Sequence, residues 1–166
     1  MDKIDYTEKE RIAIEGLGRA LKTNKFVKGQ MQFTDITNCD YFLKAYQDII
    51  RYCITWNKFL VWNGTNWDVD TRGRVGERIK KFIHQMYRTI RYISDPQLRL
   101  DFEKHLIKSE SFRRLQALEG LLKMSEEIKV EDFELDTDNY LFNVEGITLN
   151  LKTGKAKRVS SDYTTL

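Results

Sequence analysis

Apolar residues recur at three- and four-residue steps along several stretches of the chain, and this spacing predicts helices that bury one face. The clearest stretch begins near Val75, after a loop over residues 72–76, and ends near Ile93. An earlier helix is expected over residues 38–51, with Thr37 or Asn38 as its cap. Its expected buried positions are Phe42, Leu43, Tyr46, Ile49 and Ile50.

Two more helices are expected in the second half of the chain. Asp95 followed by Pro96 predicts a helix start, because the carboxylate caps free N–H groups and the first turn tolerates proline. The last long helix is expected to begin at Ser109 or Ser111. The buried positions expected for these two helices are Leu98, Phe102, Leu106 and Ile107, followed by Leu115, Leu118, Leu121 and Leu122.

The N-terminal residues carry a weaker helical pattern. Thr7 and Glu10 have the spacing of a capping box, and a modest apolar stripe follows, but Gly16 and Gly18 interrupt it. Residues 22–32 are polar and read as a linker. We therefore treat residues 1–32 as an N-terminal arm or partial helix.

Strand patterns lie between and after the helices. Asn63-Gly64 is a strong hairpin signal, since both central residues of a type I′ turn need positive φ. It would join residues 58–62 to 65–69. Residues 140–144 and 147–151 would pair across Glu145-Gly146, a turn at Thr153-Gly154 would lead to residues 155–159, and residues 128–130 read as a short strand. The βαβ rhythm of a parallel sheet is missing, so the expected class is α+β: mainly a helical bundle with two β-hairpins, one near the N-terminal third and one at the C-terminal end.

Bulk composition narrows the class of protein. A chain of 166 residues suits one domain with its own core. Apolar residues make up 41% and charged residues 32%, and no run approaches the ~18 apolar residues of a membrane helix. The first residues lack the apolar core of a signal peptide. Cys39 and Cys53 lack metal or redox spacing, so we expect reduced thiols and a cytoplasmic location without membrane contact.

Charge is segregated along the chain although the net charge is only +3. Residues 72–91 hold seven arginines and lysines against Glu77 alone, and residues 126–138 hold seven acidic residues against Lys129 alone. Such segregation creates local fields even when the total charge is small. The two segments would either meet head-to-tail between subunits, closing a ring when the rotation allows, or face solvent or pair within one chain.

No catalytic constellation is found in the sequence. A phosphate-binding loop needs Gly-x-x-x-x-Gly-Lys-Ser/Thr, but Gly154-Lys155 lacks the upstream glycine and the hydroxyl. His84 and His105 have no second ligand nearby, as a zinc site would require. Asp68 with Asp70, and Asp136 with Asp138, could hold magnesium, although solvated strand ends or loops explain them more simply. We expect no enzymatic activity, metal or cofactor in this chain.

The order of several motifs resembles one family. The motifs are the helix start Thr34-Asp35-Ile36-Thr37-Asn38, the pair Arg51-Tyr52, the hairpin from Trp62-Asn63-Gly64 to Trp67, the run Ser109-Glu110-Ser111-Phe112-Arg113-Arg114, and the segment from Leu141 to Gly154. Together they resemble the domain just upstream of the superfamily-three helicase module in phage, plasmid and poxvirus primase-helicases, over residues 33–163. Thr37-Asn38-Cys39 replaces the usual Gly-Asn-Ala, and Glu145-Gly146 the usual Asn-Gly.

The resemblance implies a domain organisation and a set of partners. Residues 33–159 would form a helicase-associated domain, and residues 160–166 would start a linker toward a helicase module of the same polypeptide. ATP and magnesium would belong to that absent module. The domain would help subunits assemble into a ring or engage DNA, while the isolated domain could remain monomeric. The alternative is a stand-alone regulator that binds nucleic acid.

Nucleic-acid contact is the sharpest prediction about individual residues. The basic face of the helix near residues 75–93, its preceding loop and the last hairpin would contact phosphates, and two tryptophans would stack on bases. A solvated helix face and tryptophans packed on a helix are the competing explanations. The phosphate-contacting candidates are Arg72, Arg74, Arg78, Lys80, Lys81, Arg88, Arg91, Lys155, Lys157 and Arg158; the stacking candidates are Trp62 and Trp67.

Overall fold

The computed structural model describes residues 6–22, 32–144 and 147–158. The chain divides into two compact units, each built from separate stretches. Residues 6–46 and 76–124 form a helical unit, and residues 47–75 together with 125 onward form a strand unit. The observed class is α+β and mainly helical, as the sequence predicted.

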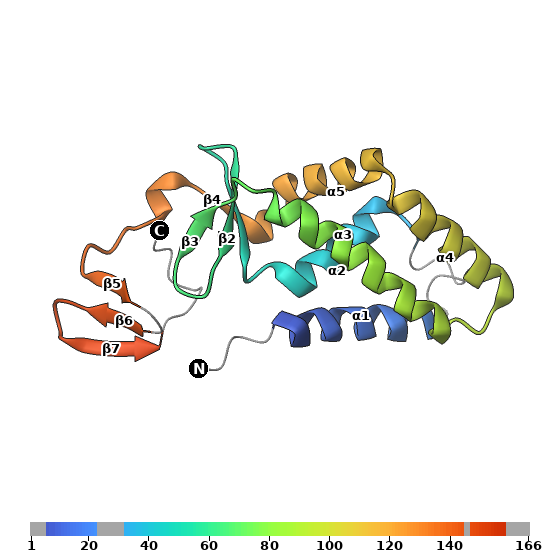
Figure 1. Cartoon of the computed structure of the whole chain (residues 1–166), viewed down its shortest axis with the longest axis horizontal. Helices are drawn as coiled ribbons and strands as arrows, with labels where there is room; N and C mark the ends of the chain where they lie inside the picture. The colour runs from blue at the N-terminus through green and yellow to red at the C-terminus, as the bar shows by residue number, and fades with distance from the viewer. Residues whose placement is uncertain (1–5, 23–31, 145–146, 159–166) are drawn as a thin grey trace. The chain divides into compact units, whose positions relative to one another are not determined.

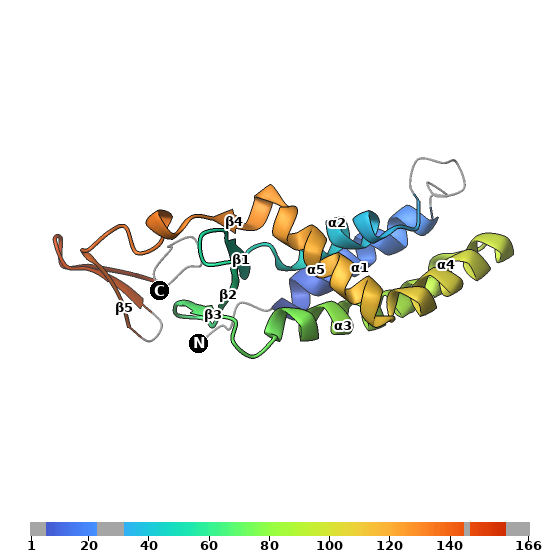
Figure 2. The same cartoon turned by 90° about the horizontal axis from the view of Figure 1, so that it is seen from above.

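The helical unit contains most of the chain's helices (Figures 1 and 2). Helix α1 packs against α2 and the 3₁₀-helix η1, and α2 also packs against α5. The bounds of these helices are α1 Tyr6–Lys22, α2 Asp35–Tyr46, α3 Arg74–Met86, η1 Tyr87–Tyr92, α4 Pro96–Ser109 and α5 Phe112–Met124.

Aromatic rings form the centre of this unit. The Phe42 ring lies 4.5 Å from that of Tyr46 and 5.6 Å, edge-on, from that of Phe82, measured between ring centroids. Leu17, Leu21, Phe102 and Leu106 are fully or almost fully buried nearby in the same unit. Edge-to-face and offset rings contribute beyond the area that they bury, so this cluster holds helices from distant parts of the sequence together.

Helix α1 is an integral part of this core. Ala13, Leu17 and Leu21 are buried, so the stretch expected as an arm or partial helix contributes a full packing face. A Cβ atom at Gly18 would lie 2.6 Å from the Tyr92 ring, which means that glycine allows the close approach of α1 to η1. The rest of the expected arm, residues 1–5 and 23–31, lies outside the described residues.

Three local predictions about helices were wrong. The second helix ends at Tyr46, and residues 50–53 form a strand instead. Thr34, not Thr37 or Asn38, caps α2, because its Oγ1 accepts the backbone N–H of Thr37 at 3.2 Å. Ile107 is 64% exposed and does not join the buried face of α4.

The start of α4 agrees with the prediction, and the end of the third helix differs from it. Asp95 caps α4 as predicted, accepting the backbone N–H of Leu98 at 2.6 Å, with Pro96 in the first turn. The third helix tightens to a 3₁₀-helix after Met86. The buried Thr89 hydroxyl donates to the Met86 carbonyl oxygen at 2.6 Å, which supports this local change.

The strand unit contains a four-stranded sheet with the order β3-β2-β1-β4. Strands β1 (Ile50–Cys53) and β2 (Lys58–Trp62) are antiparallel and pair Ile50 with Val61; β2 and β3 (Trp67–Val69) are also antiparallel. Strand β4 (Lys129–Val130), within the short strand expected at residues 128–130, pairs in parallel with β1. The sequence pattern did not predict β1. The hairpin of β2 and β3 was therefore predicted without the strand that pairs with the other edge of β2.

The first hairpin turns over four residues, not the predicted two. Trp62 pairs directly with Trp67, and the Asn63 side chain accepts the backbone N–H groups of Thr65 and Asn66 at 2.8 and 2.9 Å. Of the two residues expected at positive φ, only Gly64 has it, at 105°. The Asn63 amide thus replaces the backbone geometry of a type I′ turn.

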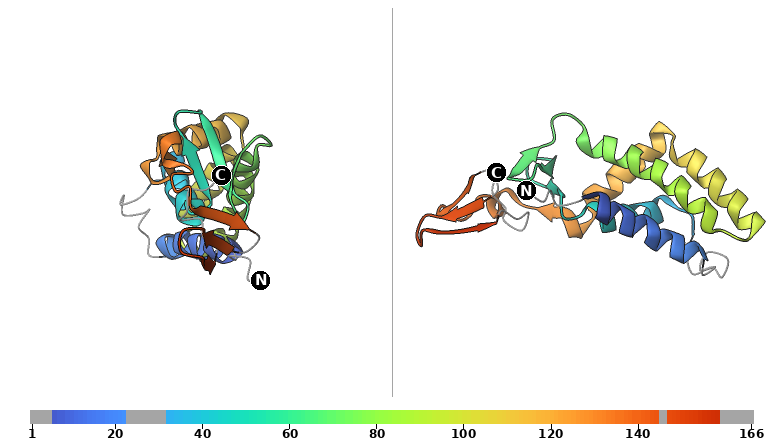
Figure 3. Two further views of the ribbon diagram at one scale, coloured as in Figure 1. Left: turned by 90° about the vertical axis from the view of Figure 1, so that its left-hand side faces the viewer. Right: turned by 60° about the horizontal axis from the view of Figure 1, so that its bottom comes forward.

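A second, three-stranded sheet has the order β5-β6-β7 (Figures 1 and 3). Its strands are β5 (Leu141–Val144), β6 (Ile147–Asn150) and β7 (Lys155–Arg158), all antiparallel. The pairing of Phe142 with Leu149 and of Leu149 with Ala156 places these three residues on one face. Gly154, at φ 66°, completes the predicted second turn, whereas Glu145 and Gly146 lie outside the described residues.

Two 3₁₀-turns form the acidic segment between the sheets: η2 (Glu126–Ile128) and η3 (Asp132–Glu134). Glu131 and Glu134 form a reciprocal capping box at η3, and the Thr55 hydroxyl donates to Glu131 Oε2 at 2.7 Å. The other carboxylates are mostly exposed. The segment is therefore a surface loop with helical turns, as expected from its composition.

Candidate functional site

Three of the seven basic residues at positions 72–91 are engaged by carboxylates. Arg74 lies 3.3 Å from Asp68 and 3.6 Å from Asp70. The Lys80 ammonium lies 2.6 Å from Glu77, and the Lys81 ammonium lies 3.0 Å from Glu10. These pairs reduce the charge that the segment can offer to a polyanion.

Arg78 is also partly engaged. Its guanidinium carbon lies 5.8 Å from the centroid of the Tyr46 ring, a cation–π distance. Its Nε atom is buried and has no hydrogen-bond partner. Arg78 therefore packs on the core of the helical unit as well as contributing positive charge.

Arg72, Arg88 and Arg91 are exposed. Arg91 donates to the Tyr92 hydroxyl at 2.9 Å and lies over the same ring. Within the residues that the structure describes, no ion pair is found for Arg72 or Arg88. These two are the candidates on this segment that retain the most available charge.

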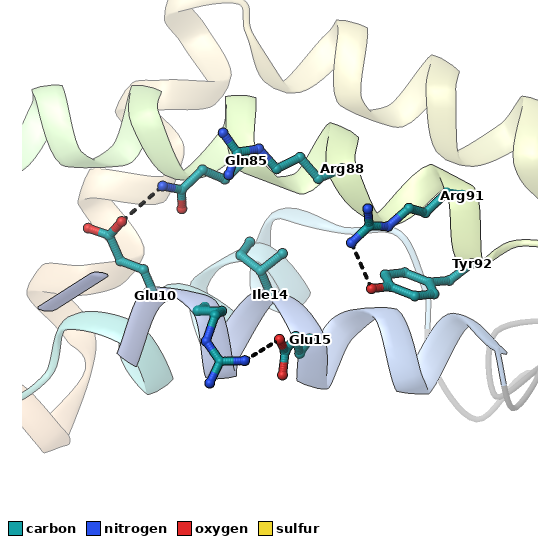
Figure 4. Close-up of a pocket in the computed structure, with 8 residues that line it drawn as sticks. Glu10, Ile14, Glu15, Gln85, Arg88, Arg91 and Tyr92 are labelled. Carbon is teal, nitrogen blue, oxygen red and sulfur yellow. Dashed lines mark hydrogen bonds and ion pairs between the residues drawn. The ribbon is translucent and has the colours of Figure 1, made fainter. Parts of the chain in front are cut away.

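Arg88 and Arg91 border a groove between α1 and the end of α3 with η1 (Figure 4). The groove has a volume of 320 Å³. In Figure 4, Glu10 on α1 reaches across to Gln85 on α3, whereas Glu15 is paired with Arg11 on its own helix. Arg11 also lines the groove and is paired with Glu15, and Glu10 is paired with Lys81, so both carboxylates of this wall are balanced by cations.

Glu10 is the most buried charged residue of this groove, with 3% of its surface exposed. It accepts hydrogen bonds from Lys81 Nζ at 3.2 Å and from Gln85 Nε2 at 2.9 Å. Burial raises the pKa of Glu10, but the interactions with Gln85, Tyr46 and Lys81 outweigh it, and the net pKa is lowered. The expected capping box is therefore wrong, because the Glu10 carboxylate faces α3.

The buried Tyr46 hydroxyl belongs to the same cluster. Burial, followed by the influence of Glu10, raises the pKa of Tyr46. The hydroxyl makes no hydrogen bond of ordinary length and angle, although the Glu10 carboxylate acts on it. The sequence contained no signal for this cluster, since its members come from three helices.

Asp70 caps α3 and is not a solvated strand end. Its side chain is 4% exposed and accepts the backbone N–H groups of Arg74 and Val75, each at 2.9 Å. Burial raises the pKa of Asp70, but the backbone hydrogen bonds outweigh it, so the pKa is lowered. Both carboxylate oxygens thus serve the helix start, which leaves Asp68 without a matching metal ligand at this position.

Trp62 and Trp67, which were predicted to stack on bases, are buried in the structure. Each is only 2% exposed, and their ring centroids lie 5.5 Å apart. The Arg51 guanidinium covers the Trp67 ring at 5.0 Å. A base cannot stack on either ring without opening the strand unit, so these tryptophans belong to its core.

The last hairpin places Lys155 and Lys157 on an exposed strand. Together with Asp138 and Thr148, they line a groove of 420 Å³. The Arg158 side chain lies outside the described residues. The two lysines remain candidates for phosphate contact, separate from those of the helical unit.

Neither histidine lies in a metal cluster, and the described part of the chain holds no group of three metal-binding side chains. His84 is exposed and lies 3.7 Å from Glu110. His105 is largely buried, and its Nε2 lies 3.1 Å from Asn38 Oδ1. Burial lowers the pKa of His105, so the ring is neutral at physiological pH.

Several motif residues that lie far apart in the sequence meet in the structure. Arg114 pairs with Asp35 at 2.5 Å, and the Asn38 amide donates to Ser109 Oγ at 3.3 Å. Both contacts join the start of α2 to the α4–α5 region. In the strand unit, Arg51 likewise covers Trp67. These motif residues therefore define the fold, and the contacts explain why they occur as a set.

Comparison with known proteins agrees with this arrangement. A family model described as D5 N terminal like matches residues 39–165, which is most of the chain. No curated protein and no solved structure gave a match. Within the described ranges, none of the helices has the length and apolar character to cross a membrane. The chain belongs to the D5 N terminal like family, the N-terminal domain of phage and plasmid primase-helicases.

Proposed function

We propose that this domain is a non-catalytic accessory part of a mobile-element replication helicase, which assists ring assembly and engagement of DNA. The observation that carries the proposal is the family match over residues 39–165. It associates the chain with a helicase module of the same polypeptide. ATP and magnesium would act at that module.

Two exposed charge groups support the assembly role. Arg72 of the strand unit and Arg88 of the helical unit are exposed cations, and Glu126 and Glu127 are exposed carboxylates at η2, of which Glu126 is paired with Lys129. Contacts between unlike surfaces of neighbouring subunits form rings when the rotation closes. Complementary charges would select that arrangement and set its sensitivity to salt.

Charge exchange in the full-length protein tests this role. One variant carries Arg72→Glu and Arg88→Glu, and the other carries Glu126→Lys and Glu127→Lys. Each alone should lose association in light scattering, because both of its surfaces have the same sign. Mixing the two should restore association, since opposite surfaces again meet.

Association that is unchanged in both single variants would overturn the assembly role. A mixture that fails to associate, although both variants fold, would also overturn it. Circular dichroism shows whether each variant folds. Lys58→Glu with Lys152→Glu is the control, because it changes the charge as much as the arginine variant does, on exposed residues of the strand unit.

A further inference from the structure

A second polar pocket in the helical unit lies apart from the α1–α3 groove. It is formed by the C-terminal half of α4, the first residue of α2 and the first turn of α5, and has a volume of 270 Å³. The charged or titratable residues that line it are Lys104, Lys108, Arg114, His105, Asp35 and Asp101.

The floor of this pocket is a closed hydrogen-bond network. Asn38 Oδ1 lies 3.1 Å from His105 Nε2, and the Asn38 amide donates to Ser109 Oγ at 3.3 Å. The Ser109 hydroxyl donates to the His105 carbonyl oxygen at 2.8 Å. Asn38 and Ser109 are 2% and 3% exposed. Satisfied buried networks are rigid, so the walls of the pocket are held in place.

Some of the charged residues around the rim have a partner and others do not. Asp35 is paired with Arg114, and Asp101 accepts a hydrogen bond from Gln97 at 3.0 Å. Lys104 and Lys108 are exposed, and in the described part of the chain no carboxylate pairs with either. They lie one turn apart on α4 and therefore point to the same side.

The His105 ring lies at the base of this pocket and is influenced mainly by its burial. Burial lowers the pKa of His105; Asp35 opposes this effect, while Arg114 and Lys108 add to it. The ring also stacks on Phe33, with centroids 5.8 Å apart. A neutral ring held between an aromatic face and a polar floor leaves the lysines as the charges available to a ligand.

We propose that this pocket binds a phosphate group through Lys104 and Lys108. A phosphate carries several acceptor oxygens and suits two lysines on adjacent turns. Arg114, at the rim, is already paired with Asp35, so the two lysines carry the positive charge that the pocket offers to an anion. The phosphate comes either from a nucleic-acid backbone or from a small phosphate compound.

The two histidines make a direct test by NMR of ¹⁵N-labelled imidazoles. Inorganic phosphate, titrated at constant ionic strength, should shift the His105 signals saturably and raise the pKa of His105, because a bound anion favours the charged ring. His84 is the internal control and should not shift saturably. The double variant Lys104→Glu with Lys108→Glu should bind phosphate at least about tenfold more weakly. A tenfold change corresponds to the loss of one charge-assisted contact.

A linear or absent shift of His105 in the wild type would overturn the proposal, as would unchanged saturation in the lysine variant. Lys104→Gln with Lys108→Gln is the milder variant if the double reversal does not fold. The control with equal charge change, Lys58→Glu with Lys152→Glu, should keep the wild-type response.

The source of the phosphate is decided by competition. A ten-nucleotide single strand that displaces inorganic phosphate at His105 identifies a nucleic-acid backbone. If inorganic phosphate and a mononucleotide both saturate the His105 shift and the strand does not displace them, the phosphate comes from a small compound. This inference goes beyond the proposed function, since the titration needs neither a ring nor a helicase module, and either can fail without the other.

Discussion

The Glu10 carboxylate and the Lys81 ammonium lie 3.0 Å apart, although 71 positions separate them in the chain. This contact fixes α1 to α3 at a point where the carboxylate is buried and the ammonium remains exposed. Gln85 and Tyr46 complete the surroundings of Glu10. The cluster therefore connects a segment outside the matched family region to the family's own helices.

Replacing Glu10 tests the importance of α1. Glu10→Ala leaves Gln85 and Lys81 without their shared acceptor, and we expect the free energy of unfolding to fall by about 1–3 kcal/mol. Urea unfolding measures this change. Glu8→Ala is the control, because its pair with Arg11 is exposed and exposed ion pairs contribute little to stability. Equal effects of the two substitutions would contradict the role of the cluster.

The lowered pKa of Glu10 gives a pH dependence with a definite sign. The unfolded state binds a proton near the ordinary pKa of 4.5, whereas the folded state binds it only at lower pH. The contribution of the ionised carboxylate is therefore present above pH 4.5 and is lost as the pH falls through the folded pKa. Between pH 7 and pH 3, thermal unfolding should show that wild type loses more stability than Glu10→Gln. Parallel losses would show that Glu10 titrates alike in both states.

Asp70 should be important as a helix cap and not as a metal ligand. Asp70→Ala removes the acceptor for two backbone N–H groups and should cost about 0.5–2 kcal/mol of stability. Asp70→Asn should retain only part of that stability, since its single amide oxygen can accept just one of the two N–H groups that Asp70 accepts with separate oxygens. Magnesium should leave the unfolding midpoint of the wild type unchanged. A rise in that midpoint that disappears in Asp70→Asn would instead support metal binding.

Fluorescence can test the burial of the tryptophans. Trp56 is 37% exposed, whereas Trp62 and Trp67 are each 2% exposed. Acrylamide should quench mainly Trp56, and Trp56→Phe should remove most of the quenchable emission. An oligonucleotide should not quench the remaining two tryptophans. Strong quenching in Trp56→Phe would restore the stacking hypothesis for the first hairpin.

DNA engagement should depend on the basic residues without carboxylate partners. Arg72→Glu with Arg88→Glu should weaken binding and reduce the salt slope by about 2, roughly one per lost phosphate contact. Lys58→Glu with Lys152→Glu is the control with the same change of charge, and Lys80→Gln, on α3, tests a lysine that is already paired with Glu77; the affinity of both should change little. Anisotropy at several salt concentrations measures both quantities. Equal losses for the arginine variant and the control with the same change of charge would mean that simple charge, not position, governs binding.

Local chemistry explains which parts of the fold could be predicted. Asp95 with Pro96 and the glycine at position 154 act on their immediate neighbours, so their helix start and turn follow from the sequence. Strand β1 was misread because Ile49 and Ile50 suit the end of a helix as well as a strand. Its pairing with β2 on one side and β4 on the other decides the outcome, and such pairing is invisible in a local pattern.

The candidate site shows the same limit. The basic residues could be found by their clustering, but their availability depends on carboxylates contributed by other elements, as for Lys81 with Glu10. The pocket around His105 was missed because Asn38 and Ser109 carry no signal until α2 and α4 come together. The motif positions were recognised as a set, yet only the contacts explain their physical role.

The parallel pairing of β1 with β4 has a practical consequence for protein production. All of α4 and α5 lies between these strands in the chain, so neither compact unit can be isolated by a single truncation. A shortened expression product ending before Ser125 would leave Tyr52 and Cys53 of β1 without the strand that pairs with them, and unpaired strand edges promote aggregation. Excising the helical unit would instead require a designed junction between residues 46 and 76.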